Sequence, residues 1–537
     1  MSRCEITTAC LALLLAAPLS TPAASHHHGD PPAGEEQQIP LFDGLGSFHR
    51  AVSTSSARAQ AYFDQGMMLG YAFGRPEAAL SFQAAAEIDP DCAACYLGEA
   101  WTLGPYQNEK MSAKNAPLAY AAAQKALAHK DLASDVERAL IEAMAVRYVA
   151  DPQQERADLD QAYSDAMKVV AERFPGDLDV NALYAESLMV LHPWDLYPGG
   201  KLRIEGQEAI RVLEKVLAAD IHHAGACHMY IHSVEESSTP ERAEVCADLL
   251  ADGIPLGSHI QHMPSHIYMR IGRYGDGVRA NQKAQMVDHR ARRGQAVAIY
   301  PNHNTNMLCY AAWMDGQSAV ALQAARDLQG TGRRAMMLPL MLARFGRWDE
   351  LKAMRKAPKG LLPEGIRQFT RGLAFLRTGE PAKASRALNR LEKILGRADP
   401  EETFAPETTD KPIDLLRIAH GILAGETAAA AGETAAAVRY LEIAIAAEDG
   451  LEYSEPEIWP LPARQILGAI LLDAGRAKEA QRVYEEELEN HRENGWSLFG
   501  LSAALRAQGK GGEADAVRAR FEAAWARSDV WLTASRF

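Results

Sequence analysis

The chain has 537 residues, of which 47% are hydrophobic, and a formal net charge of −14 at pH 7. An acidic balance of this size argues against nucleic acid and anionic membrane surfaces as partners. The length exceeds what one compact core usually holds, but a repeat array can reach it because each repeat packs only on its neighbours.

The N-terminus has the order of a secretory signal peptide over residues 1–25. Arg3 is followed by an apolar run from Ala9 to Ala17 and then by small residues and proline up to Ser25. This run is too short to cross a bilayer, and no later stretch approaches the roughly 20 apolar residues of a membrane helix. We therefore expect no membrane span and a mature protein that is periplasmic or secreted.

Residues 26–45 are rich in histidine and proline, with His26 to His28 placed before Pro31 and Pro32. Histidines near a new N-terminus can bind copper or nickel. The simpler interpretation, which we prefer, is a disordered tail.

Five cysteines remain beyond the signal peptide. Cys92 and Cys95 form a C-x-x-C at a predicted helix start, and Cys227 and Cys246 lie on consecutive helical segments. Because an exported chain can oxidise its cysteines, we expect one or two disulfides, with Cys309 left over. A redox or metal-binding role for the C-x-x-C is the weaker alternative, since the βαβ context and a second C-x-x-C are missing.

The remaining chain is predicted to be all-α. Alanine, leucine, glutamate and arginine recur with a 3.6-residue period, and no alternating strand pattern stands out. A 34-residue repeat, the tetratricopeptide length, is clearest near the C-terminus. There Leu467, Leu471, Gly475 and Ala480 recur as Leu501, Leu505, Gly509 and Ala514. We predict a right-handed α-solenoid of tetratricopeptide (TPR) repeats.

The repeats divide into two arrays. Residues 46–398 form the main array, residues 399–412, rich in proline, glutamate and threonine, form a linker, and residues 413–530 form C-terminal repeats. Insertions at 192–206 and 290–301 interrupt the main array. Long loops in a regular solenoid often serve function.

Histidines follow the same 34-residue period. His228 and His232 recur as His262 and His266, with His259 beside the second pair. Each pair is spaced i, i+4, which puts both rings on one helix face, close enough to hold one metal ion between them.

The repeat register places these rings in the concave groove of the solenoid. First helices of three successive repeats are predicted to begin near Ala224, Ser258 and Asn302, and the third adds His303. Three neighbouring helices thus present six histidines to one surface. The predicted metal ligands are His228, His232, His259, His262, His266 and His303.

Ligation by histidine without cysteine suits a transition metal rather than calcium or magnesium. Six histidines can hold one ion, or two with three histidines each. We expect copper first, and zinc or iron as alternatives. Glu235, Tyr310 and His223 are candidate catalytic residues or partners of the ligand rings, because a metal-bound imidazole donates its other nitrogen to a carboxylate or carbonyl.

The chain also resembles a family of bacterial exported TPR proteins over residues 60–320. The resemblance is carried by blocks at 92–100 (C-x-x-C, then Gly-Glu-Ala), 193–195 (Pro-Trp-Asp), 228–235 (His-x-x-x-His-x-x-Glu), 262–267 (His-Met-Pro-Ser-His-Ile) and 303–306 (His-Asn-Thr-Asn). It implies the fold and a histidine site, but no particular reaction. The family pattern has a histidine where this chain has Asn306, so one ligand is missing or replaced by an amide.

As an enzyme, the protein would use an open coordination position on the metal for hydrolysis or, with copper, for oxidation, and we favour an oxidoreductase over a hydrolase. Met263 follows His262, so the His-Glu-x-x-His of zinc proteases is missing. Trp194 and Asp195 on an inserted loop favour a covered pocket for a small-molecule or peptide substrate in the groove. The alternatives are a TPR scaffold that binds a protein or peptide partner without catalysis, and a periplasmic protein for metal storage or delivery.

Overall fold

The computed structural model describes residues 39–151, 154–328, 334–356, 359–404 and 410–537. The predicted signal peptide and most of the predicted tail lie outside these ranges. The end of that tail packs on the first helix, since Ile39 and Leu45 are buried and the Tyr62 hydroxyl donates to the Ile39 carbonyl (3.0 Å). No helix within the described ranges has the length and apolarity of a membrane span.

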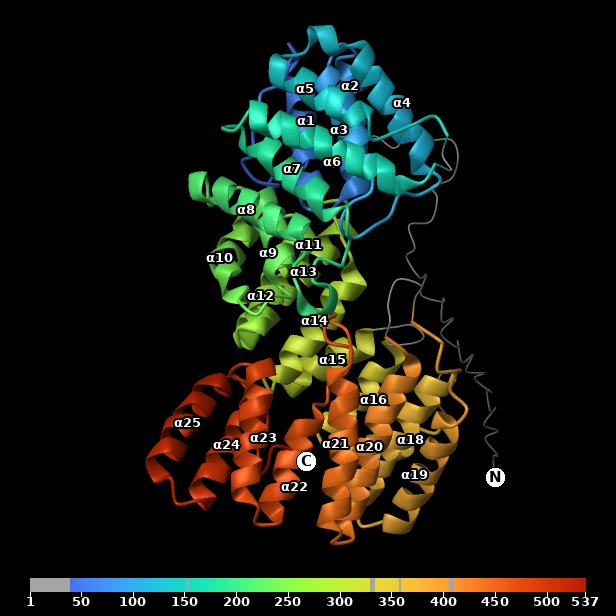
Figure 1. The fold of residues 1–537 in the computed structure, drawn as a ribbon, viewed down its shortest axis with the longest axis vertical. Helices are drawn as coiled ribbons and strands as arrows, with labels where there is room; N and C mark the ends of the chain where they lie inside the picture. Colours follow the sequence, from blue (N-terminus) through green and yellow to red (C-terminus); the bar gives the residue numbers. More distant parts are fainter. Residues whose placement is uncertain (1–38, 152–153, 329–333, 357–358, 405–409) are drawn as a thin grey trace, which may run out of the picture. The chain divides into compact units, whose positions relative to one another are not determined.

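The described chain is built of helices (Figure 1). The first group is α1 (Ala57–Tyr71), α2 (Arg75–Ile88), α3 (Ala93–Leu103), α4 (Asn115–Ala128), η1 (Lys130–Leu132), α5 (Asp135–Ala145), α6 (Arg156–Arg173), α7 (Leu178–Met189) and η2 (Pro198–Gly200). The second is α8 (Ile204–Ala219), α9 (Ala224–Val234), η3 (Pro240–Ala243), α10 (Glu244–Gly253), α11 (Ser258–His262), α12 (Pro264–Arg270), α13 (Tyr274–Ala291) and α14 (Pro301–Met314). The third is α15 (Ser318–Asp327), α16 (Arg334–Arg344), α17 (Trp348–Ala353), α18 (Leu361–Arg377), α19 (Pro381–Leu395), α20 (Pro412–Ala430), α21 (Thr434–Asp449), α22 (Ala463–Asp473), α23 (Ala477–Asn490), α24 (Gly495–Ala507) and α25 (Gly511–Ala524).

Each helix packs chiefly on the next one along the chain, which is the pattern of a helix-turn-helix solenoid. In the described ranges β pairing is limited to two isolated bridges. The predicted repeat positions behave as expected in α22 to α25. Gly475 and Gly509 end the first helix of each pair with φ of 73° and 77°, a conformation that favours glycine. Ala480 and Ala514 are fully buried where the paired helices meet. The all-α TPR solenoid is therefore confirmed.

The apolar core has two main parts. One is formed by side chains between Ile39 and Ile299 and the other by side chains between Met269 and Leu532. Helices α11, α12 and α14, which carry four of the six histidines, lie where these two parts meet. The predicted linker at 399–412 joins α19 to α20, which also pack on each other. The division into two arrays stays a prediction.

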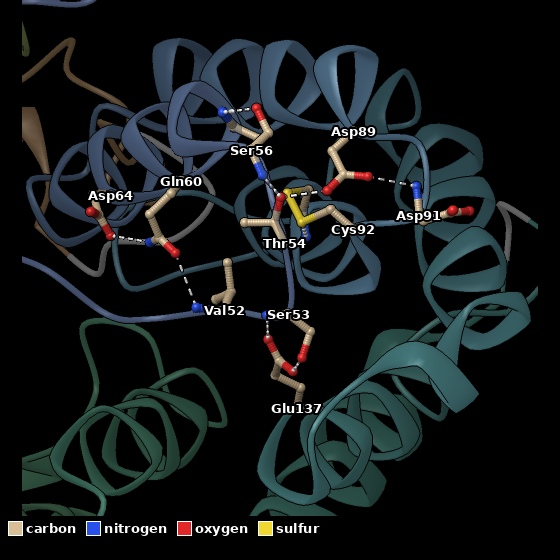
Figure 2. Close-up of a disulfide and its surroundings, with 12 residues drawn as sticks. Val52, Ser53, Thr54, Ser56, Gln60, Asp64, Asp89, Asp91, Cys92 and Glu137 are labelled. Atoms are coloured by element: carbon tan, nitrogen blue, oxygen red, sulfur yellow. Dashed lines mark hydrogen bonds between the residues drawn. A yellow bond between two sulfur atoms is a disulfide. The ribbon is translucent and has the colours of Figure 1, made fainter.

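Both expected disulfides are present, Cys92–Cys95 and Cys227–Cys246, and Cys309 is free and buried. Cys92 is the N-cap of α3 and accepts a hydrogen bond from the Cys95 amide (3.2 Å). Figure 2 shows the segment beside it, where the Thr54 hydroxyl donates to Asp89. Cys227 immediately precedes His228, so the second disulfide ties the first histidine helix, α9, to α10.

Candidate metal centre

Four helices carry the six histidines. His228 and His232 lie on α9, and His303 lies on the first turn of α14. The other three lie on α11 and α12, which meet at Met263. That residue keeps helical angles (φ −51°, ψ −38°), and the break arises because Pro264 has no N–H to donate. The i, i+4 spacing of His262 and His266 therefore survives the break.

Five of the six histidines are buried, and His303 is half-buried at the edge of the cluster. His228 and His262 are 0% exposed, His259 and His266 are 1% exposed and His232 is 4% exposed. Burial, followed by the neighbouring rings, lowers the pKa of His262 well below its usual value. Burial is also the largest cause that lowers the pKa of His266, and it lowers that of His303 to about 3. His262, His266 and His303 are therefore neutral at pH 7.

The shortest contact between two ligand rings brings two nitrogen lone pairs together. The His262 Nδ1–H donates to the Asn281 side-chain oxygen (3.1 Å), whose amide group donates in turn to a backbone carbonyl. The His266 Nδ1–H donates to Glu235 (2.7 Å). A neutral imidazole carries one proton, so both Nε2 atoms bear lone pairs. They face each other at 2.9 Å with no proton between them.

A similar contact lies on the other side of the cluster. The His228 Nδ1–H donates to the Tyr71 carbonyl (2.6 Å), which leaves its Nε2 as a lone pair 3.2 Å from Nε2 of His259. Nitrogens bound to one ion at about 2.0 to 2.1 Å lie about 2.9 to 3.4 Å apart when the angle between the bonds is 90 to 110°. Both distances fit two edges of a metal coordination shell.

Glu235 joins the two halves of the cluster. Its two oxygens accept the Nδ1–H groups of His232 (3.1 Å) and His266 (2.7 Å), so each ring turns its Nε2 inward. Burial alone would raise the pKa of Glu235, but the two histidines outweigh it and lower the pKa to about 2. The inward Nε2 of His232 has no hydrogen-bond partner in the described part of the chain.

Three groups of side chains in the cluster can hold a metal ion. In each group the ligand atoms lie within 4.8 Å of one another. The groups are His228, His232 and His259; His262, His266 and His303; and His232, Glu235 and His266. The first two groups share no residue, so the cluster offers two separate three-histidine sites. The candidate Glu235 joins them from outside as the partner of one ring in each.

Aromatic side chains enclose the rings from strained backbone positions. Over the described residues, four non-glycine residues have positive φ, and three of them contact histidines of the cluster. The Phe73 ring (φ 61°) stacks on His232 at 5.7 Å between centroids. Trp194 (φ 59°) meets His232 edge-on, and Tyr300 (φ 53°) meets His259 edge-on. Backbone strain of this kind concentrates at functional sites.

A cavity of about 430 Å³ opens beside the cluster. His232, His259, His266 and His303 form its floor, and Trp194 from the first inserted loop lines its wall. A pocket lined by the inserted loop is therefore present. The segment 452–455, which no motif in the sequence indicates, also lines the cavity. Its Glu455 contacts Nδ1 of His266.

The structure places Tyr310 and His223, the other two candidate catalytic residues, away from the cavity. The Tyr310 hydroxyl lies 3.3 Å from Nε2 of His491, in a different part of the core. His223 is the N-cap of α9, where its Nδ1 accepts from a backbone amide, and its Nε2 lies 3.3 Å from Asp179. Asn306, where the resembled family has a histidine, does not line the cavity, and its buried side-chain oxygen has no hydrogen-bond partner among the described residues.

The fold and the site define an all-α TPR solenoid with a cluster of six histidines, five of them buried. No protein-family model matches the chain. No curated protein matches its sequence.

Solved structures with some similarity include human IFIT1 with m7Gppp-AAAA (11% identity, 87% of this chain and 90% of that chain, TM-score 0.29). Yeast Tom70 is another (10% identity, 87% and 91%, TM-score 0.28). A third is the TPR domain of P58(IPK) (12% identity, 84% and 99%, TM-score 0.23). Identities this low and TM-scores below 0.5 imply nothing about what this chain binds.

Proposed function

We propose that this protein is an exported TPR metalloprotein that binds one or two transition-metal ions between its six clustered histidines. The observation that carries the proposal is the 2.9 Å approach of the His262 and His266 Nε2 atoms. Both Nδ1 atoms already donate to other groups, so two lone pairs face each other in a buried site. Such a contact is repulsive by itself and becomes favourable when a cation lies between the two nitrogens.

Two ions, one in each three-histidine group, use the cluster most fully. Metal-bound histidines characteristically donate their second nitrogen to a carboxylate, an amide oxygen or a backbone carbonyl. Glu235, Asn281 and the Tyr71 carbonyl already fill these roles. All-nitrogen ligation favours copper, followed by zinc or iron.

The cavity supports an enzyme rather than a closed storage site. It reaches four of the six histidines and leaves room for a substrate at the metal. With copper this is an oxidoreductase and with zinc a hydrolase, and we favour the oxidoreductase. One alternative is a metal storage or delivery protein, which would bind metal without turnover. The other is a TPR scaffold, which would bind no metal.

We further propose that the protein is exported to a bacterial periplasm or secreted. The signal-like sequence at 1–25 and the two disulfides support an oxidising compartment. The histidine blocks support membership of the bacterial family that the sequence resembles.

Elemental analysis of the mature protein, purified without a histidine tag, tests the proposal. We expect one or two equivalents of copper, zinc or iron in the wild type. The content should fall in His228→Ala, His262→Ala and His266→Ala but stay unchanged in His289→Ala, which replaces an exposed histidine on α13. A folded wild type that binds no metal even after reconstitution would refute the metalloprotein and leave the scaffold.

The Glu235→Gln variant should bind metal about 10 to 100-fold more weakly than the wild type. A glutamine has one oxygen in place of two, so it cannot give His232 and His266 an acceptor oxygen each. Competition with a chromophoric chelator measures the loss. Glu236→Gln is the matched control, because its side chain is next in sequence and lines the same cavity without bonding a ligand ring. Equal affinities for both variants would mean that Glu235 does not orient the ligands.

A further inference from the structure

The walls of the cavity beside the histidines indicate the kind of molecule that enters it. This inference rests on the proposed function, because the histidine cluster forms the cavity floor. At about 430 Å³, the cavity has the size of a small-molecule site and is too small for a folded partner. Its lining is rich in carboxyl groups, aromatic rings and hydrogen-bond acceptors.

Apart from histidine and tyrosine, the ionisable side chains that line the cavity are carboxylic acids. The five carboxyl groups are those of Glu235, Glu236, Asp410, Glu452 and Glu455. Among the described residues that line the cavity there is neither lysine nor arginine. Arg270 lines the neighbouring cavity instead, with its guanidinium 5.4 Å from the centre of the Tyr453 ring. The described lining residues therefore offer an anionic ligand no lysine or arginine to pair with.

The metal ions themselves would add positive charge at the floor. Glu235 lies between the two histidine groups and offsets part of that charge. Of the other four carboxyl groups, Glu236 is half-buried at the cavity and Glu455 contacts His266. Asp410 accepts a hydrogen bond from the Glu452 amide (2.9 Å).

Aromatic rings complete the wall. Trp194 is 51% exposed and held by a left-handed backbone, and Tyr197 and Tyr300 lie on the same cavity. Aromatic faces combined with carboxylates recognise organic cations, because the ring face is electron-rich.

Two side-chain amide oxygens of the lining have no hydrogen-bond donor among the described residues. Gln107 is 4% exposed and lines the cavity, and its side-chain oxygen has no hydrogen-bond partner within the described ranges. The same holds for the side-chain oxygen of Asn108. A buried amide oxygen without a partner costs about 1 to 3 kcal/mol, and a ligand N–H group would remove this cost.

We infer that the cavity binds a small organic cation, namely an amine in its ammonium form. The ammonium group donates to the amide and carboxyl oxygens, and the adjoining carbon skeleton packs on the aromatic wall.

Three probes with similar aromatic skeletons and different charges test the inference. They are 2-phenylethylamine, 2-phenylethanol and 3-phenylpropionate, titrated by calorimetry into the full-length protein. We expect the amine to bind at least about tenfold more tightly than the alcohol, a difference of about 1.4 kcal/mol, and the carboxylate to give no signal. Carboxylate binding as tight as that of the amine would overturn the inference, and so would a failure of the amine to bind at millimolar concentration.

Variants locate the binding. Trp194→Ala should weaken amine binding about five- to tenfold, as expected for one cation–π contact, and Trp194→Phe should restore most of it. Trp531→Ala is the control, because Trp531 is 84% exposed and lines none of the described cavities. Glu236→Gln should weaken the amine and leave the alcohol unchanged. Amine affinity that is unaltered in both Trp194→Ala and Glu236→Gln would place the binding elsewhere and contradict the inference.

Metal analysis of the same samples separates the two proposals. A protein that contains metal but binds no amine keeps the proposed function and loses this inference. A protein without metal that still prefers the amine keeps the inference as a binding property and loses the metalloenzyme.

Discussion

The metal-free protein is expected to lose stability steeply between about pH 6.5 and pH 5, a window set by the ordinary histidine pKa. Burial lowers the folded-state pKa of five clustered histidines, to about 3 for His303. The five are His228, His259, His262, His266 and His303. Below pH 6.5 these histidines are therefore protonated in the unfolded chain but neutral in the folded chain. The free energy of unfolding falls as the pH falls.

The expected size of this effect is large. Each histidine contributes up to about 1.4 kcal/mol per pH unit, so five together approach about 7 kcal/mol per pH unit. That compares with a total stability of about 5 to 15 kcal/mol for a typical domain.

Burial raises the folded-state pKa of three carboxyl groups, Glu236, Glu448 and Glu455. These groups oppose part of this slope, because the folded chain binds protons there that the unfolded chain does not. Carboxylates with lowered pKa values act at lower pH. The partners of Asp179 lower its pKa to about 2 against the effect of burial. The stabilisation that this carboxylate gives is present above about pH 4 and is lost as the pH falls below that value.

Urea unfolding of the chelator-treated protein at a series of pH values measures the slope. The matched control is the double variant His262→Gln and His266→Gln, which keeps similar side-chain volumes and cannot take up these two protons. Its stability should depend on pH less steeply by about 3 kcal/mol per pH unit. Superimposable profiles for variant and wild type would show that the buried histidines do not govern the acid response.

The fold was predictable because the repeat fixes local register. The predicted first helices near Ala224, Ser258 and Asn302 begin at Ala224, Ser258 and Pro301. Periodicity at 3.6 and 34 residues carries this information, since each repeat packs on its sequence neighbours. The same register brought the six histidines to one cluster, because equivalent positions of adjacent repeats lie side by side.

The position of Tyr310 could not be predicted from the repeat register. Tyr310 lies seven residues after His303, which is nearly the same helix face but about 10 Å further along the axis. The histidine cluster does not extend that far along the helix axis, so the Tyr310 hydroxyl contacts His491 instead. His223 precedes α9 and uses its Nδ1 to cap the helix. A face assignment from periodicity gives direction around the axis but not depth along it.

Other parts of the site come from tertiary contacts that the sequence does not signal. The Tyr71 carbonyl that orients His228 is a backbone atom, which its residue type does not reveal. Phe73 and Tyr300 line the cluster through left-handed turns, and bulky residues are not expected in that conformation. Glu455 approaches from a segment nearly two hundred residues away in sequence, beyond the reach of any local repeat.

The second large effect concerns the stability of the His262→Gln variant relative to the wild type. The sign of this stability difference should depend on whether metal is bound. Replacing a buried, bonded side chain usually costs about 1 to 3 kcal/mol. In His262→Gln the loss of the bond to Asn281 is offset, because one of the two facing lone pairs disappears and the new amide can donate to Nε2 of His266. We therefore expect metal-free His262→Gln to be at least as stable as the metal-free wild type.

Metal should reverse that order. An ion present at a thousandfold excess over its Kd stabilises the folded wild type by about 4 kcal/mol per site, and His262→Gln should lose most of this gain at one of its two sites. Thermal unfolding of both proteins, with and without metal, measures the four values. His491→Gln is the control, because His491 is also buried but is bonded on both sides, to Glu457 and Glu487 (2.8 Å each). Its substitution should destabilise the protein by about 3 to 5 kcal/mol whether or not metal is present. If metal-free His262→Gln is destabilised as much as His491→Gln, then the nitrogens of the cluster are satisfied without an ion, and the case for a metal centre fails.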